Sequence, residues 1–166
     1  MVLNGFTRYF DRFLRTLDAE GVGIFQAIVY IHFAMGATYC GLAAGGVPDS
    51  VRDGLGGGPI DTTWMWAAVG SMICLVGKVL SARGDRRLYW VHTTGLWLQF
   101  AGDSCAFGAF WGYVIATAST TTWGTPIIGA FVFAALGDCA ALLMLRDIRR
   151  WQQAERALRK AKAGVS

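Results

Sequence analysis

Residues 88–117 read LYWVHTTGLWLQFAGDSCAFGAFWGYVIAT, and Asp103 is the only charged residue among them. Between positions 88 and 145 the only other charged residue is Asp138. A helix needs roughly 20 mostly apolar residues to cross the hydrocarbon core of a bilayer. The sequence therefore predicts an all-α protein built as a four-helix transmembrane bundle. The four predicted membrane-spanning segments are about 22–46, 62–82, 88–117 and 123–145.

The composition of the whole chain points the same way. Hydrophobic residues make up 54% and charged residues 16% of the 166 residues, whereas soluble domains carry about 25% charged residues. Soluble helices of this length would show a charged stripe on one face, and these segments do not. Alternating strands of about ten residues, the pattern of membrane barrels, are also missing from the sequence. We therefore expect a helical membrane protein.

The distribution of basic residues predicts the orientation. Fourteen of the fifteen Lys and Arg residues fall in or beside the N-terminal arm, the middle loop and the C-terminal tail, and only Arg52 falls in another loop. Basic residues collect on the cytoplasmic side of membrane proteins. We expect two helical hairpins in the cytoplasmic (inner) membrane, with both termini cytoplasmic. The fourteen are Arg8, Arg12, Arg15, Lys78, Arg83, Arg86, Arg87, Arg146, Arg149, Arg150, Arg156, Arg159, Lys160 and Lys162.

The two ends of the chain differ from the apolar middle. Residues 1–20 place apolar and basic side chains on opposite faces, which predicts an amphipathic helix in the membrane interface. Residues 21–146 form the predicted transmembrane domain, and 147–166 form a basic, helical cytoplasmic tail. We interpret the net charge of +4 as attraction to anionic lipid headgroups. We do not expect nucleic-acid binding, and the tail is a candidate site for a cytoplasmic partner.

Polar residues inside the predicted membrane segments are the candidates for function. His92, Gln99 and Asp103 recur at helical spacing and form one polar stripe. Such residues usually face the bundle interior or a water-filled path. One interpretation is a polar lumen or proton relay; the other is structural hydrogen bonding between helices. The lumen or relay candidates are His32, His92, Gln99, Asp103 and Asp138. For the structural interpretation, a second stripe on segment 62–82 supplies Lys78, which we expect to pair with Asp138. Asp103 would then bond to a hydroxyl group or to His32.

Small residues at four-residue spacing predict close helix packing. Gly108-x-x-x-Gly112 is a G-x-x-x-G motif, which lets helix backbones approach closely within one chain or between chains. We therefore expect homo-oligomers. The predicted packing residues are Ala37, Gly41, Gly45, Ser104, Gly108, Gly112 and Ala116.

No enzyme signature is visible in the sequence. It has no H-E-x-x-H, no G-x-S-x-G, no phosphate-binding loop and no His, Asp and Glu cluster at metal-ligand spacing. We therefore predict no enzymatic activity, no metal and no cofactor. The four cysteines, one per segment, form no C-x-x-C pair, and we expect them to be small buried packing residues. They are Cys40, Cys74, Cys105 and Cys139.

The chain resembles the small phage-type membrane proteins that include holins. The likeness lies in closely spaced apolar segments, Gly108-x-x-x-Gly112 and the basic tail RDIRRWQQAERALRKAK (146–162). The Ala-, Gly-, Arg- and Trp-rich composition is compatible with a phage or an actinobacterial origin. The resemblance implies a homo-oligomeric membrane pore. Two alternatives stay open: a small proton- or ion-coupled channel or transporter, and a non-transporting accessory or scaffold protein.

Overall fold

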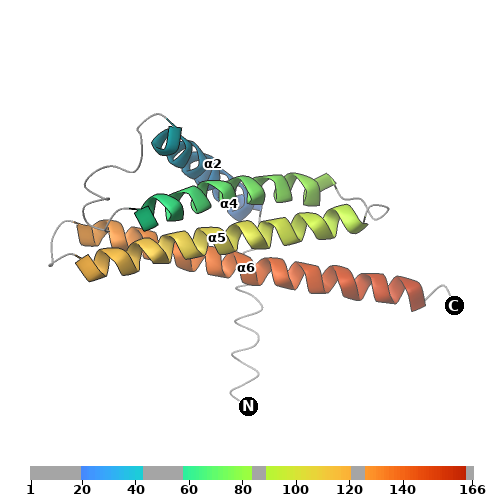
Figure 1. Cartoon of the computed structure of the whole chain (residues 1–166). Helices are drawn as coiled ribbons and strands as arrows, with labels where there is room; N and C mark the ends of the chain where they lie inside the picture. Colours follow the sequence, from blue (N-terminus) through green and yellow to red (C-terminus); the bar gives the residue numbers. More distant parts are fainter. Residues whose placement is uncertain (1–19, 43–57, 84–88, 121–125, 164–166) are drawn as a thin grey trace, which may run out of the picture.

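The computed structural model describes four helices, and every described residue lies in one of them. They are α2 (Glu20–Leu42), α4 (Gly58–Arg83), α5 (Tyr89–Thr120) and α6 (Pro126–Ala163) (Figure 1). The predicted all-α class is confirmed. The predicted interfacial helix at 1–20 lies, apart from Glu20, outside the described residues, as do the loops between the helices.

α5 is the central element of the packing. It contacts α4 along one side and α6 along another, while α2 packs against α4. α4, α5 and α6 run alongside one another, and α2 lies obliquely across them (Figure 1). Residues far apart in sequence therefore meet on the inward face of α5.

The outer surface of the helices is apolar. Large side chains such as Phe25 on α2, Met65 on α4 and Phe131 on α6 are at least half exposed. A soluble protein would not expose so many, but hydrocarbon solvates them. α2, α4 and α6 are each long and apolar enough to cross a membrane, which indicates a multi-pass membrane protein. The apolar segments are Val22–Cys40, Trp64–Ala82 and Ile128–Ala161.

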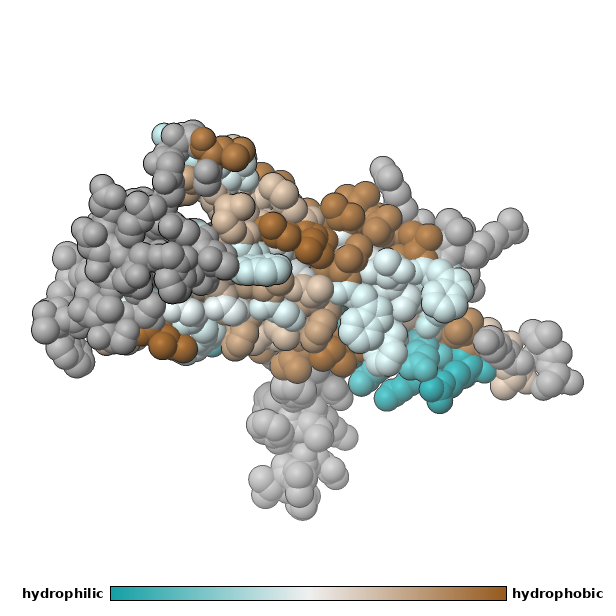
Figure 2. Space-filling model, in the orientation of Figure 1, coloured by the Kyte–Doolittle hydropathy of each residue, from teal (hydrophilic) through white to brown (hydrophobic). Residues whose placement is uncertain are grey.

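α6 continues without a break through the predicted boundary between transmembrane domain and tail. It has 38 residues, or about 57 Å at 1.5 Å per residue, well beyond the ~30 Å of a hydrocarbon core. Hydrophilic residues gather toward its C-terminal end, whereas apolar surface covers much of the remaining helices in this view (Figure 2). The basic tail is thus an extension of the same helix.

The close approach of α4 and α5 depends on four glycines at seven-residue spacing. A Cβ on Gly77 would lie 2.7 Å from the backbone oxygen of Gly95, and one on Gly102 would lie 2.5 Å from that of Gly70. Real side chains essentially never sit so close. The two backbones therefore touch only because all four positions lack side chains.

None of the predicted packing residues is one of these four glycines. Ala37 is buried, but Gly108 is exposed and a Cβ there would meet nothing within 4 Å. Ser104 bonds to the Phe100 carbonyl of its own helix at 2.7 Å, and Gly112 is half-buried. Gly41 and Ala116 lie in α2 and α5, whereas Gly45 lies outside the described residues.

Candidate functional site

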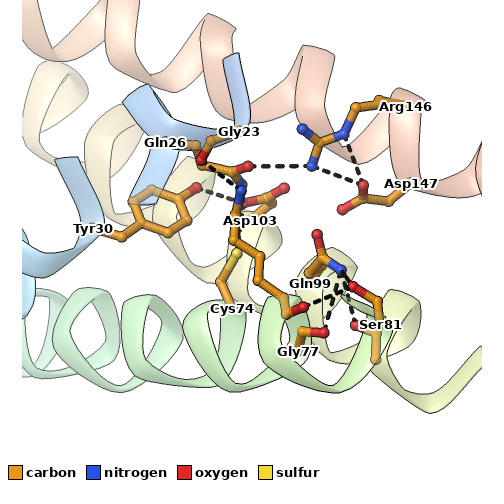
Figure 3. A network of polar contacts seen from close by, with 12 residues as sticks. Gly23, Gln26, Tyr30, Cys74, Gly77, Ser81, Gln99, Asp103, Arg146 and Asp147 are labelled. Atoms are coloured by element: carbon orange, nitrogen blue, oxygen red, sulfur yellow. Dashed lines mark hydrogen bonds and ion pairs between the residues drawn. The ribbon is translucent and has the colours of Figure 1, made fainter. Parts of the chain in front are cut away.

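Asp103 stands at the junction of three helices, with its side chain fully buried. Its Oδ1 atom accepts hydrogen bonds from Tyr30 Oη at 2.6 Å and Gln26 Nε2 at 2.8 Å, both on α2 (Figure 3). The thiol of Cys74 on α4 approaches the same oxygen at 3.5 Å. One carboxylate oxygen on α5 therefore ties α2 and α4 to α5.

Gln26 extends this cluster to α6. Its amide group donates to Asp103, and its Oε1 atom accepts from Arg146 Nη2 at 3.2 Å. Only this orientation of the amide serves both a carboxylate and a guanidinium, because nitrogen donates and oxygen accepts. Arg146 in turn bonds to Oδ1 of Asp147 through Nε and Nη2, both at 2.9 Å. All four described helices thus contribute to one buried network.

A second group of polar contacts links α4 to α5 and to α2, and begins at Gln99, one turn before Asp103 on α5. Gln99 Nε2 donates to Ser81 Oγ at 2.8 Å, and His92 Nδ1 lies 3.0 Å from the Ser81 carbonyl oxygen. Lys78 Nζ donates to the Gly23 carbonyl of α2 at 2.9 Å. These bonds give polar partners to side chains that would otherwise be costly to hold between apolar helices.

Acidic and basic side chains meet in this region, and two carboxylate oxygens there have no hydrogen-bond partner among the described residues. Two carboxylates, Asp103 and Asp147, stand with one buried guanidinium, that of Arg146, and the half-buried ammonium of Lys78. Among the described residues, Oδ2 of Asp103 and Oδ2 of Asp147 are buried and accept no hydrogen bond. A buried polar atom without a partner is costly and calls for a functional explanation.

Aromatic rings close the bundle at the end opposite the basic tail. Phe33 stacks on Trp64 at 5.2 Å and meets Phe110 edge-on at 4.9 Å. Phe133 and Tyr113 complete the cluster, with ring centroids 4.4 Å apart. We call these five rings the aromatic cluster. It fills the interior from all four helices, and the space left between its rings is about 10 Å³.

Two larger hollows flank the network. The polar hollow, about 590 Å³, lies between α4, α5 and α6 and is lined by Lys78, His92 and Gln99 among others. The apolar cleft, about 330 Å³, lies between α2 and α6 and reaches Gln26 and Tyr30, the two α2 side chains that donate to Asp103. Asp103 therefore lies between the polar hollow and the apolar cleft.

The predicted stripe on α5 does face the interior. Gln99 and Asp103 are buried and His92 is half-buried. The three do not bond to one another; each reaches a neighbouring helix instead.

The structure places His32, Asp138 and Lys78 differently from the expectation. His32 is exposed and bonds only to the Ile28 carbonyl of its own helix among the described residues. Asp138 is exposed as well, so neither side chain faces the interior of the described helices. Lys78 is not paired with Asp138, because its ammonium is held by Gly23.

The helical period explains the error at Asp138. Asp147 follows it by nine residues, about two and a half turns, so the two carboxylates point to opposite sides of α6. Asp147 takes the inward side with Arg146. Arg146 and Asp147 stand at the start of the basic end of the sequence, and an acidic residue beside an arginine at the edge of an apolar segment is a usable signal for such a pair. The other two residues that the sequence analysis missed, Gln26 and Tyr30, could be recognised only as polar groups at helical spacing in an apolar segment.

The cysteines differ in environment. Cys74 is buried in the network, Cys40 and Cys105 are half-buried, and Cys139 is exposed. The prediction of buried packing residues is therefore wrong for Cys139, which is exposed on α6 next to Asp138. Among the described helices, no group of three or more His, Cys, Asp and Glu residues is placed to hold a metal ion.

Comparison with known proteins adds no further assignment. No protein-family model, curated protein or solved structure matches the chain. The geometry of the site is therefore the basis for the functional proposal.

Proposed function

We propose that the chain is a small proton-coupled channel or transporter of the cytoplasmic membrane, in which Asp103 takes up and releases the proton. The observation that carries the proposal is the state of that carboxylate: it is fully buried, one oxygen accepts from Tyr30 and Gln26, and the other accepts no bond from the described residues. An oxygen in that position is free to receive a proton. Ionisable residues inside membrane proteins commonly serve proton relays.

The polar hollow, which lies near Asp103 on one side, supports the proposal. The polar hollow reaches Gln99, one helical turn before Asp103 on the same face of α5. In the opposite direction the aromatic cluster fills the interior, and its rings offer few polar atoms to a chain of water. A pathway open at one end and closed at the other is the arrangement that alternating access requires. We propose that the aromatic cluster is the closed gate.

The proposal includes four membrane crossings, with the N- and C-termini on the cytoplasmic side. α5 is not among the three helices that are apolar enough to cross a membrane by themselves, but α4 and α6 pack against it. Polar residues are tolerated at membrane depth where protein surrounds them. The polar hollow and the basic end of α6 then face the cytoplasm, as the positive-inside rule requires.

Proton flux in liposomes tests the proposal. Purified protein is reconstituted, a pH gradient and a potassium-valinomycin potential are imposed, and proton entry is followed with an internal pH dye. Asp103→Asn keeps the size and the accepting oxygen of the side chain but removes the exchangeable charge. We expect it to abolish flux, whereas Asp138→Asn, which removes the exposed carboxylate, leaves flux unchanged.

A homo-oligomeric pore of holin-like type is a second candidate, favoured by one observation. Gly108 of the G-x-x-x-G motif is exposed and a Cβ there meets nothing, so this face is not used by the chain's own helices. A second copy could pack against it closely.

Induced expression of the wild-type chain tests the pore directly. Holin-like assembly predicts collapse of the membrane potential and arrest of growth, with rescue by Gly108→Trp, which blocks close packing. Growth and potential that stay normal on wild-type expression reject this candidate. A purified monomer in mild detergent would also count against it.

A further inference from the structure

The polar hollow has the chemistry of an anion site. Among the described residues, the charged ones that line it are Lys78 and Arg150, and no Asp or Glu does. His92 and the amides of Gln99 and Gln153 add polar groups around the same space. Three helices supply these residues, so the hollow is a feature of the folded bundle and not of one basic segment.

We propose that the polar hollow binds a phosphate-bearing anion. Ammonium and guanidinium groups form strong, charge-assisted hydrogen bonds to phosphate oxygens, and a guanidinium can donate two at once. The amide nitrogen of Gln153 supplies a further donor. A volume of about 590 Å³ is ample for a phosphate and the glycerol attached to it, since sites for small molecules run from about 300 to 1,000 Å³.

The position of the hollow agrees with this ligand. It lies where α6 passes from its apolar part to its basic end, and Arg150 and Gln153 belong to that transition. Basic pockets between membrane helices on the cytoplasmic side bind the headgroups of acidic lipids. The same phosphate chemistry would hold free inorganic phosphate, so the two sources must be separated by experiment.

A bound phosphate would also change the electrostatics of the proton path. Lys78 and Arg150 set a positive potential in the hollow, which opposes the entry of a cation. A phosphate group there offsets part of this positive charge. The binding site itself does not depend on proton transport, because it follows from the lining residues alone.

Binding is tested on the full chain in a nonionic detergent. Short-chain phosphatidylglycerol, short-chain phosphatidylcholine and inorganic phosphate are titrated separately, and the thermal unfolding midpoint and ligand-bound masses in native mass spectrometry are recorded. Saturable binding of phosphatidylglycerol alone identifies an acidic headgroup. Saturable binding of inorganic phosphate identifies a free-anion site. No saturable binding of either overturns the proposal.

The variant Arg150→Gln removes one charge from the hollow, and we expect affinity to fall about fivefold, as one basic residue near a lipid surface contributes. The matched control is Arg156→Gln, which removes the same charge from an exposed position on the same helix and should leave affinity unchanged. Equal losses in the two variants would show non-specific attraction to the basic tail and would contradict the proposal. Lys78→Gln is a second test, interpreted only if its unfolding midpoint shows that the bond to Gly23 is not needed for folding.

Discussion

Tyr30 and Asp103 are joined by a hydrogen bond of 2.6 Å between helices α2 and α5, in the most buried part of the protein. The bond holds one oxygen of the carboxylate in place while the other accepts nothing from the described residues. It thus unites the two roles that the sequence left open: the same contact that fixes the helices also orients the group proposed to carry a proton.

Removing the Tyr30 hydroxyl should loosen α2. Tyr30→Phe keeps the ring but removes a donor to a carboxylate, and hydrogen bonds to charged groups contribute about 1.5–3 kcal/mol. We expect a lower unfolding midpoint in detergent. Tyr39→Phe is the control, because Tyr39 is 65% exposed. Equal midpoints for the two variants would mean that the Tyr30 bond does not stabilise the fold.

Arg146 and Asp147 should behave as a pair. Arg146→Leu leaves the Asp147 carboxylate buried without its partner, which costs about 3–5 kcal/mol. The double variant Arg146→Leu with Asp147→Leu removes both charges and should be milder than the single one. A double-mutant cycle on the unfolding free energy measures this coupling. Additive single effects would show that the two side chains do not interact.

The contact between α4 and α5 at Gly70, Gly77, Gly95 and Gly102 should tolerate no side chain. Gly77→Ala pushes a methyl group against the α5 backbone, where a Cβ would lie 2.7 Å from Gly95 oxygen, and overpacking of this kind costs about 1–3 kcal/mol. Gly36→Ala is the control, because a Cβ there meets nothing within 4 Å. We expect thermal unfolding to separate the two variants clearly. A Gly77→Ala protein as stable as wild type would show that α4 and α5 are farther apart.

Opening the aromatic cluster should raise proton leak. Phe33→Ala removes the ring that stacks on Trp64 and leaves space in the proposed gate. We expect faster decay of a pH gradient in proteoliposomes than with the wild-type chain. Phe131→Ala deletes a ring that is 72% exposed on α6 and should not change the decay. Leak that rises equally in both variants would reflect general loosening of the protein.

The sequence predicted the inward stripe on α5 because period alone fixes which residues share a face. Gln99 and Asp103 are four residues apart, and the face that carries them is buried. Their partners could not be predicted in the same way. Whether Tyr30 or His32 reaches Asp103 depends on how α2 is rotated about its axis, which no residue count gives.

The small-residue patterns show the same limit. Four-residue spacing drew attention to Gly108 and Gly112, whereas the helices meet at Gly70, Gly77, Gly95 and Gly102. Residues seven apart also lie on one helix face, so the spacing of these four glycines was a second possible signal for close helix packing. On α6, Asp138 and Asp147 lie on opposite sides of the helix. Which of the two faces inward depends on the rotation of α6 about its axis, and only the packed structure gives that rotation.

The most direct test of the central claim is proton flux measured on Asp103→Asn beside its own thermal stability. If Asp103 carries the proton, flux through reconstituted Asp103→Asn falls to that of empty liposomes while the unfolding midpoint stays close to wild type, and Asp103→Glu restores part of the flux. Flux that persists in a folded Asp103→Asn protein would contradict the claim, and would leave Asp103 as a hydrogen-bond acceptor that holds helices together.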